Sequence, residues 1–265
     1  MKKILTLFLS LFITFTITNI CFARDIKFAQ VTDVYFRNNS ANLSKIIKDI
    51  NKNSDIDFVL FTGNNIGKAN IDNLESFLKA LKKLNKPYYL VLGNKDVSKS
   101  HNLEKSTYLK TVRKYNKRHP KSPNYVFKKG DIVFLVVDGS KELIPSVNGF
   151  YSQDTIKWVD KQLTKYNTNK VIIAQHFPLM NKPNNEYYTT YNILEYMQML
   201  SKHSNVIAVI SGHYNQNDEI TYNGVYHITT PRASDGYYKI IDIEMTNGPS
   251  IYTVLKDIRQ WQSTQ

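Results

Sequence analysis

The stretch YYLVLGNKD, residues 88–96, is an apolar run with an abrupt polar end. Its first five residues are aromatic, β-branched or leucine, which predicts a short buried strand. The Gly93-Asn94 pair that follows permits a tight turn, so that the polar groups after the strand point into a crevice. The carboxyl ends of strands in α/β proteins are where such crevices bind ligands.

The same pattern of an apolar strand with a polar end occurs at four other places in the chain. Residues 26–32 end at Asp33, residues 58–62 at Gly63-Asn64, residues 171–175 at His176, and residues 206–211 at Gly212-His213. Because the carboxyl ends of parallel strands lie close together at one edge of a sheet, we expect these side chains to converge on one site.

Segments with apolar residues at helical spacing lie between these strands and predict a layered α/β architecture. The first predicted helix, residues 41–51, carries Leu43, Ile46, Ile47 and Ile50 on one face. Asp72 and Ser152 are expected to cap two later helices, because both residue types accept hydrogen bonds from a first turn. A fourth helix is predicted near residues 191–203, and a surface helix with loops within residues 97–123.

The second half of the chain also contains hairpin signals. Residues 124–129 and 132–138 flank Gly130-Asp131, which predicts two antiparallel strands. Nearer the C-terminus, residues 219–222, 225–230, 237–244 and 250–255 are separated by turn-forming pairs such as Asn223-Gly224. We expect these four segments to be successive antiparallel strands.

The N-terminus has the layout of a secretory signal peptide. Lys2 and Lys3 precede a mostly apolar stretch, residues 4–20, which is closed by Cys21-Phe22-Ala23. We predict a signal peptide at residues 1–23 and one domain at residues 24–265, with an uncleaved N-terminal anchor as the alternative. Cleavage would leave no stable membrane anchor and no cysteine, and would export the protein to the periplasm or the extracellular space.

The chain is basic, with 35 Lys and Arg residues against 22 Asp and Glu residues and a formal net charge of +13. The lysines are spread along the sequence, which is typical of a solvated surface and not of a nucleic-acid-binding patch. We therefore expect no nucleic-acid partner. The net positive charge favours a small phosphorylated or otherwise anionic ligand, which we expect as the partner.

In sequence order, the strand ends carry Asp33 and Tyr35, Gly63-Asn64, Gly93-Asn94-Lys95-Asp96, His176, and Gly212-His213-Tyr214-Asn215. This series resembles the calcineurin-like metallophosphoesterases, whose motifs run Asp-x-His, Gly-Asp, Gly-Asn-His-Asp/Glu, a lone His, and Gly-His-x-His. The resemblance implies a four-layer α/β/β/α sandwich with two mixed sheets. It also implies phosphoester hydrolysis at a two-metal site that activates a hydroxide and clamps phosphoryl oxygens.

The resemblance implies a role for each matching position. Asp33, Asn94, His176 and His213 match metal ligands, and Asn64 stands where the bridging aspartate would be. Lys95 replaces a histidine that acts at the leaving group, next to the matching Asp96, so both are candidate catalytic residues. Tyr35 and Asn215 replace two further metal-binding histidines, which leaves the first metal position with Asp33 as its one good ligand.

Two functional alternatives follow from these replacements. In the first, the chain is an exported metallophosphoesterase with weak or single-metal hydrolysis, and one iron, manganese or zinc ion is held at the better-preserved position. In the second, it is a catalytically inactive pseudophosphoesterase that binds a ligand or a partner. Lys95 is either a fixed positive charge on a phosphate oxygen or a solvated turn residue. His176 and His213 are either site residues or structural histidines.

Overall fold

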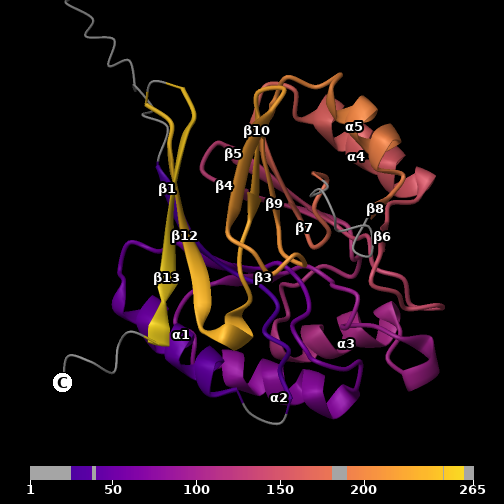
Figure 1. Cartoon of the computed structure of the whole chain (residues 1–265), viewed down its shortest axis with the longest axis vertical. Coiled ribbons are helices and arrows are strands. Elements are labelled where there is room, and N and C mark those ends of the chain that lie inside the picture. Colours follow the sequence, from indigo (N-terminus) through magenta and orange to yellow (C-terminus); the bar gives the residue numbers. More distant parts are fainter. Residues whose placement is uncertain (1–24, 38–39, 181–189, 247, 260–265) are drawn as a thin grey trace, which may run out of the picture.

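Three parallel strands and two antiparallel strands form the first sheet (Figure 1). The computed structural model describes residues 25–37, 40–180, 190–246 and 248–259. The sheet order is β13-β12-β1-β2-β3, in which β1, β2 and β3 are parallel and β12 and β13 are antiparallel to their neighbours. The bounds are β1 Ile26–Val31, β2 Phe58–Phe61, β3 Tyr88–Leu90, β12 Tyr237–Glu244 and β13 Ser250–Asp257.

The second sheet is also mixed, with the order β10-β11-β9-β7-β5-β4. Its four central strands are parallel, and β4 and β10 pair antiparallel at its two edges. The bounds are β4 Tyr125–Lys129, β5 Ile132–Val137, β7 Lys170–Gln175, β9 Val206–Ser211, β10 Asp218–Tyr222 and β11 Val225–Thr229. The predicted hairpin of β4 and β5 is confirmed.

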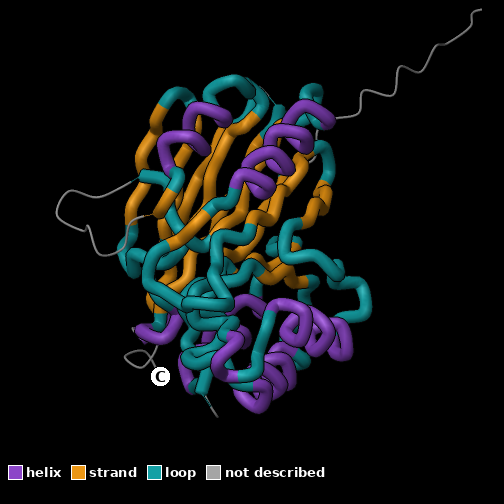
Figure 2. The backbone as a smooth tube through the Cα atoms, turned by 90° about the vertical axis from the view of Figure 1, so that its right-hand side faces the viewer, coloured by secondary structure: helices purple, strands orange, loops and turns teal. Residues whose placement is uncertain are grey.

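Helices cover the outer face of each sheet (Figure 2). The first sheet carries α1 (Ala41–Lys52), α2 (Ile71–Leu81) and α3 (Lys105–Tyr115), and the second carries α4 (Gln153–Lys165) and α5 (Ile193–Leu200). Shorter elements complete the described fold: β6 Gly149–Phe150, β8 Thr190–Tyr191, η1 Lys99–His101 and η3 Ala233–Asp235.

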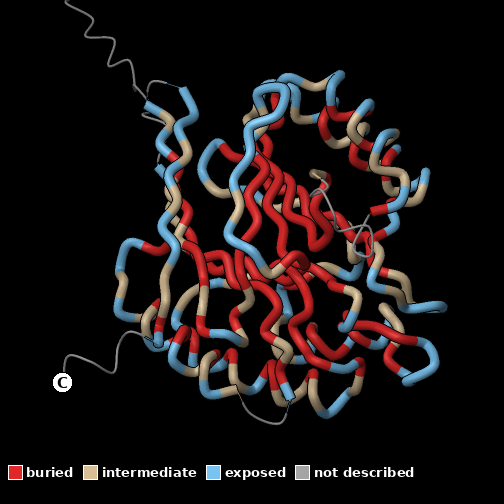
Figure 3. The backbone as a smooth tube through the Cα atoms, viewed as in Figure 1, coloured by how far each residue is buried: buried red, intermediate tan, exposed pale blue. Residues whose placement is uncertain are grey.

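Three hydrophobic cores separate the four layers. Alternate residues of a strand enter different cores, because successive side chains point to opposite faces of a sheet. In β2, Phe58 and Leu60 pack between the two sheets, whereas Val59 and Phe61 pack under the helices. A third core lies between the second sheet and its helices. The predicted four-layer α/β/β/α sandwich is confirmed, and Figure 3 shows its central strands buried.

Of the two helix caps predicted from the sequence, one is confirmed and one is wrong. Ser152 caps α4 as predicted, since its side chain accepts a hydrogen bond from the Thr155 backbone. The prediction that Asp72 caps α2 is wrong. Asn70 is the cap, and its side chain accepts from the backbone N–H groups of Asp72 and Asn73, which leaves Asp72 in the first turn.

Two further expectations are corrected by long-range packing. Two of the predicted C-terminal antiparallel pairs are confirmed, β10 with β11 and β12 with β13. They do not form one continuous set, because β11 lies in the second sheet and β12 crosses to pair with β1 in the first. The helix expected at the surface within residues 97–123 is α3, and it buries Tyr108, Leu109 and Val112 in the core under the first sheet.

The predicted signal peptide, residues 1–23, lies outside the described residues and stays a prediction. Among the residues that the structure does describe, no helix is both long and apolar enough to cross a membrane.

The inter-sheet core gives a stability test. Phe58 is fully buried and stacks on Phe28 with ring centroids 4.8 Å apart. We expect Phe58→Ala to lower the free energy of unfolding by about 3–5 kcal/mol, because the cavity cannot fully collapse between two sheets. The matched control is Tyr252→Ala on β13, where the side chain is 54% exposed, and its change should stay within about 0.5 kcal/mol. Urea denaturation measures both, and equal effects would contradict this account of the core.

Candidate functional site

The structure brings the predicted strand-end residues together at one edge where the two sheets meet. Asp33 follows β1, Asn64 follows β2, and the pair Asn94-Lys95 follows β3 in the first sheet. His176 follows β7 and His213 follows β9 in the second sheet. Hydrogen bonds join them across both sheets, so residues far apart in sequence form one cluster.

The buried carboxylate of Asp33 is the centre of this cluster. Its Oδ1 accepts from Asn64 Nδ2 at 2.8 Å, and its Oδ2 accepts from the backbone N–H of His213 at 2.9 Å and from Thr32 Oγ1 at 2.9 Å. The other end of the Asn64 amide, Oδ1, accepts from the backbone N–H of Lys95 at 2.9 Å. Both ends of Asn64 are therefore occupied by protein groups.

Several site residues have a backbone conformation that residues other than glycine seldom adopt. The φ angle is 50° at Asp33, 48° at Tyr35, 51° at Asn64, 68° at His213 and 54° at Asn215. These values lie in the left-handed region, which costs free energy for residues other than glycine and is concentrated at functional sites. The cluster of five such positions marks the strand ends as a built site.

Two glycines allow the strand ends to approach closely. A Cβ atom at Gly93 would overlap the backbone nitrogen and side-chain oxygen of Asn64, and one at Gly212 would overlap Thr32 Oγ1. Both positions therefore exclude any side chain. The Gly-Asn and Gly-His pairs of the sequence are explained by this contact between neighbouring turns.

Asp96, predicted as a catalytic candidate, lies fully buried beneath the pocket and does not line it. Its carboxylate accepts hydrogen bonds from the backbone N–H groups of Gly93 at 2.8 Å and Ile66 at 3.0 Å, and from Asn65 Nδ2 at 3.2 Å. Burial raises the pKa of Asp96 to about 7, although these hydrogen bonds act in the opposite direction. The Asp96 carboxylate thus joins the turn after β3, at Gly93, to the turn after β2, at Asn65 and Ile66.

His176 and His213 lie side by side, with ring centroids 5.0 Å apart. His176 Nδ1 lies 2.8 Å from the carbonyl oxygen of Thr62, and a carbonyl can only accept, so this nitrogen carries the proton. Burial lowers the pKa of both imidazoles, and for His213 the neighbouring His176 lowers it further. Both rings are therefore neutral at pH 7. The Nε2 atom of His176 is buried and has no hydrogen-bond partner among the described residues.

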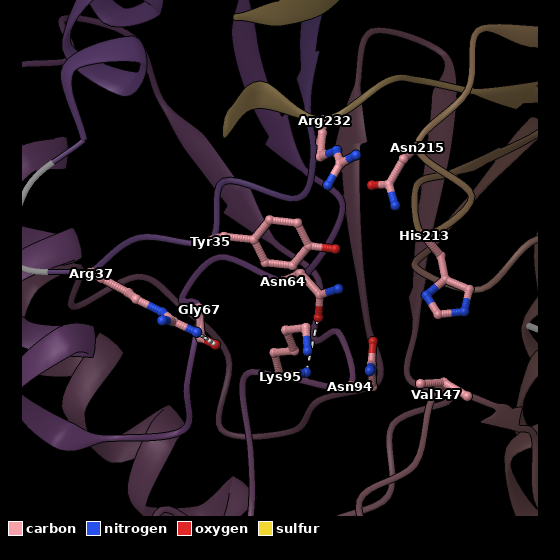
Figure 4. A pocket seen from close by; sticks show the side chains of 10 residues that line it. All are labelled: Tyr35, Arg37, Asn64, Gly67, Asn94, Lys95, Val147, His213, Asn215 and Arg232. Carbon is pink, nitrogen blue, oxygen red and sulfur yellow. Dashed lines mark hydrogen bonds between the residues drawn. The ribbon is translucent and has the colours of Figure 1, made fainter. Parts of the chain in front are cut away.

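A pocket of about 390 Å³ opens above this cluster (Figure 4). Of the predicted site residues, Tyr35, Asn64, Asn94, Lys95, His213 and Asn215 line it, whereas Asp33, Asp96 and His176 lie below. The remaining lining residues are Arg37, Gly67, Val147 and Arg232. The described lining thus contains three permanent cations and no carboxylate.

Arg37 and Arg232 are the site residues that the sequence did not indicate. Arg37 comes two positions after Tyr35 and donates from Nη2 to the Gly67 carbonyl at 3.4 Å. Arg232 comes from the connection between β11 and β12, and its Nε is 2.8 Å from Asp235. Arg37 is close to Asp33 in the sequence, so the sequence could have suggested it as a site residue. Arg232 carries no motif, and only the crossing of the chain between sheets places it at the pocket.

The residues present do not fit a two-metal centre. The bridging position is held by Asn64, a neutral amide whose oxygen and nitrogen are both used within the protein. Burial and the nearby Asp33 carboxylate raise the pKa of Tyr35, so its phenol is neutral at neutral pH and supplies no negative charge to the site. Among the described residues, no group of three or more His, Cys, Asp or Glu side chains is arranged to hold a metal ion.

Comparison with known proteins identifies the family. Residues 26–216 match the family model of calcineurin-like phosphoesterases, which is well over half of the chain. The chain belongs to this family. The search among curated proteins finds no matching relative.

Several solved structures share the fold at low sequence identity. A dimetal phosphatase from Danio rerio is 14% identical, with a TM-score of 0.68, over 88% of this chain and 99% of that one. GAP50 of Plasmodium, described as the anchor in the inner membrane complex, is 16% identical, with a TM-score of 0.59, over 89% and 85%. The protein TT1561 of Thermus thermophilus is 14% identical, with a TM-score of 0.59, over 89% and 100%.

Asp96 gives a pH-dependent prediction. Because its folded pKa of about 7 lies above the value of 3.8 expected without the fold, its contribution to stability is full below pH 4 and is lost as pH rises through 7. Asp96→Asn abolishes this titration but loses one hydrogen-bond acceptor. We expect the variant to be less stable than the parent at pH 5, with the gap narrowing by roughly 2 kcal/mol by pH 8.

Urea denaturation of both proteins at the two pH values measures this gap. A gap that stays constant between pH 5 and pH 8 would show that the Asp96 pKa is not raised by burial.

Proposed function

We propose that this calcineurin-like phosphoesterase family member binds the phosphoryl group of a small ligand through side-chain cations and amides, and that it lacks two-metal hydrolysis. The observation that carries the proposal is the occupied bridging position. Asn64 is held between the Asp33 carboxylate and the Lys95 backbone, while Arg37, Lys95 and Arg232 line the pocket above it.

The chemistry of the lining favours an anion over a cation. Charge-assisted hydrogen bonds from Lys or Arg to phosphate oxygens are about twice as strong as neutral ones. Arg37 and Arg232 offer planar guanidinium groups suited to two oxygens at once, and Lys95 offers a compact point charge. The amides of Asn94 and Asn215 also line the pocket, and their Nδ2 groups are hydrogen-bond donors that suit phosphate oxygens.

The same lining explains why efficient hydrolysis is not proposed. Metal ions in two-metal sites lower the pKa of a bound water and clamp both the attacking and the leaving oxygen. Side-chain cations stabilise charge on phosphate oxygens, but they do not supply a metal-bound hydroxide. Lys95 and the arginines therefore support binding and partial charge stabilisation, and leave the water to react without activation.

A second candidate function is single-metal hydrolysis, because His176 Nε2 and Asn94 Oδ1 are buried and unpartnered in the described part of the chain. Together with His213 these donors would hold one iron, manganese or zinc ion, which would act as a Lewis acid on a phosphoryl oxygen. This donor set has no carboxylate, and three cations line the adjoining pocket. Ion binding is therefore opposed by charge repulsion.

Export is part of the proposal. The basic start, apolar middle and small closing residues of segment 1–23 support a cleaved signal peptide and a periplasmic or extracellular location.

Binding of inorganic phosphate in the presence of a chelator tests the first proposal. We expect isothermal titration to detect binding with EDTA present, and Arg232→Ala to weaken it about tenfold, which is about 1.4 kcal/mol. Lys157→Ala is the matched control, because Lys157 is an exposed cation on α4 outside the pocket. Binding that disappears with EDTA and returns with Mn²⁺ or Zn²⁺ would overturn the proposal.

Turnover separates the two candidates. A chromogenic phosphomonoester assayed with added manganese, zinc or iron should show no turnover above buffer. Metal-dependent turnover that is abolished by His213→Ala would instead establish the single-metal enzyme.

Restoring the family's residues tests whether the replacements account for the lost chemistry. The variant carrying Tyr35→His, Asn64→Asp, Lys95→His and Asn215→His regains one carboxylate and three imidazoles at residues that line the pocket. We expect it to bind two divalent ions per chain by elemental analysis and to hydrolyse the chromogenic substrate at least tenfold faster than the parent. Two bound ions without added turnover would show that metal loss is not the reason for low activity.

A further inference from the structure

A second cavity adjoins the pocket of the proposed function. Its volume is about 340 Å³, and it shares Gly67, Asn94 and Lys95 with the first pocket. The rest of its described lining is Lys68, Ala69, Val97, Ser98, Ser100, His101 and Pro145. Since the same Lys95 lines both cavities, a ligand in the first pocket can continue into the second.

The second cavity combines lysines and polar side chains with the apolar Ala69, Val97 and Pro145. Lys68 is exposed at its rim, Lys95 lies at the boundary, and no carboxylate is among the described lining residues. Ser98 Oγ lies 2.9 Å from Ser100 Oγ and 3.0 Å from His101 Nδ1, which gives a connected set of hydroxyl and imidazole groups. Each of these groups can both donate and accept hydrogen bonds, and the positive charges of Lys68 and Lys95 are what favour an anionic group in the cavity.

The hydrogen-bonded set is held in place by the backbone around it. Ser98 is buried and pairs with Leu103 through two backbone hydrogen bonds of 2.8 and 3.0 Å, which close a small loop around η1. Asn102 ends η1 in the left-handed conformation, with φ of 56°. The side chains of Ser98, Ser100 and His101 are therefore presented by an ordered turn.

Size and composition narrow the ligand class. Small-molecule sites usually measure about 300–1,000 Å³, and each cavity is near the lower end of that range. No Phe, Tyr or Trp is among the described lining residues of the second cavity, so it lacks the stacking surface that a nucleobase uses.

We propose that the ligand carries a second anionic group, which lies in the cavity lined by Lys68, Ser98, Ser100 and His101 while the first phosphoryl group lies by Arg232. The inference rests on the proposed function and names its ligand class: a small polar molecule with two phosphate groups, such as a bisphosphorylated sugar. Lys95 lies between the two anionic groups and offsets their mutual repulsion.

The test compares a hexose bisphosphate, the matching hexose monophosphate and inorganic phosphate by isothermal titration on the purified protein with EDTA. We expect the bisphosphate to bind at least tenfold more tightly than the monophosphate. Lys68→Ala should remove that tenfold advantage and leave the affinity for inorganic phosphate unchanged. Lys99→Ala is the matched control. Lys99 is an exposed lysine of η1, the turn that carries Ser100 and His101, and it does not line the cavity.

Arg232→Ala separates this inference from the proposed function, because it should weaken all three ligands. If inorganic phosphate binds but the bisphosphate gains nothing over the monophosphate, the second anionic site is wrong and the proposed function stands. An equal loss in the Lys68→Ala and Lys99→Ala variants would show a general charge effect and also overturn the second site. If none of the three ligands binds to the parent protein, both proposals fail.

Discussion

The buried Asp33 carboxylate is the interaction on which the rest of the site depends. It receives hydrogen bonds from Asn64 in the first sheet and from the backbone of His213 in the second, so it fixes the two sheets relative to one another at the pocket. A buried carboxylate is costly unless its oxygens are satisfied, and three donors satisfy this one. Removing one donor would disturb the geometry of both sheets at once.

The backbone turns of the site do not depend on the side chains that differ from the family's motifs. The turns are held by main-chain hydrogen bonds, such as Asp33 N to Gly63 O at 3.0 Å and Gly212 N to His176 O at 3.0 Å, and these do not depend on the side chains at positions 64 or 215. Gly93 and Gly212 keep the strand ends in contact. The fold therefore tolerates a change of chemistry at the pocket without a change of architecture.

The charged side chains that line the pocket are all cations. Asn64 is a neutral amide at its centre, and Arg37, Lys95 and Arg232 lie around it. A lining without carboxylates repels cations and attracts anions. In the proposed function, the chain's own cations therefore take the phosphate-binding role of metal ions, whereas activation of water has no such substitute.

The sequence by itself determined most of the secondary structure and the main members of the site. Apolar periodicity marked β1, β2, β7 and β9, and the polar residues after them meet at the pocket. It could not decide between Asn70 and Asp72 as a cap, because both residue types cap helices and they lie in the same turn. Tertiary structure alone separated β11 from β12, buried Asp96 beneath the pocket and placed Arg232 in its lining. The reason is that strand pairing and burial depend on contacts between distant segments, for which local residue patterns carry no signal.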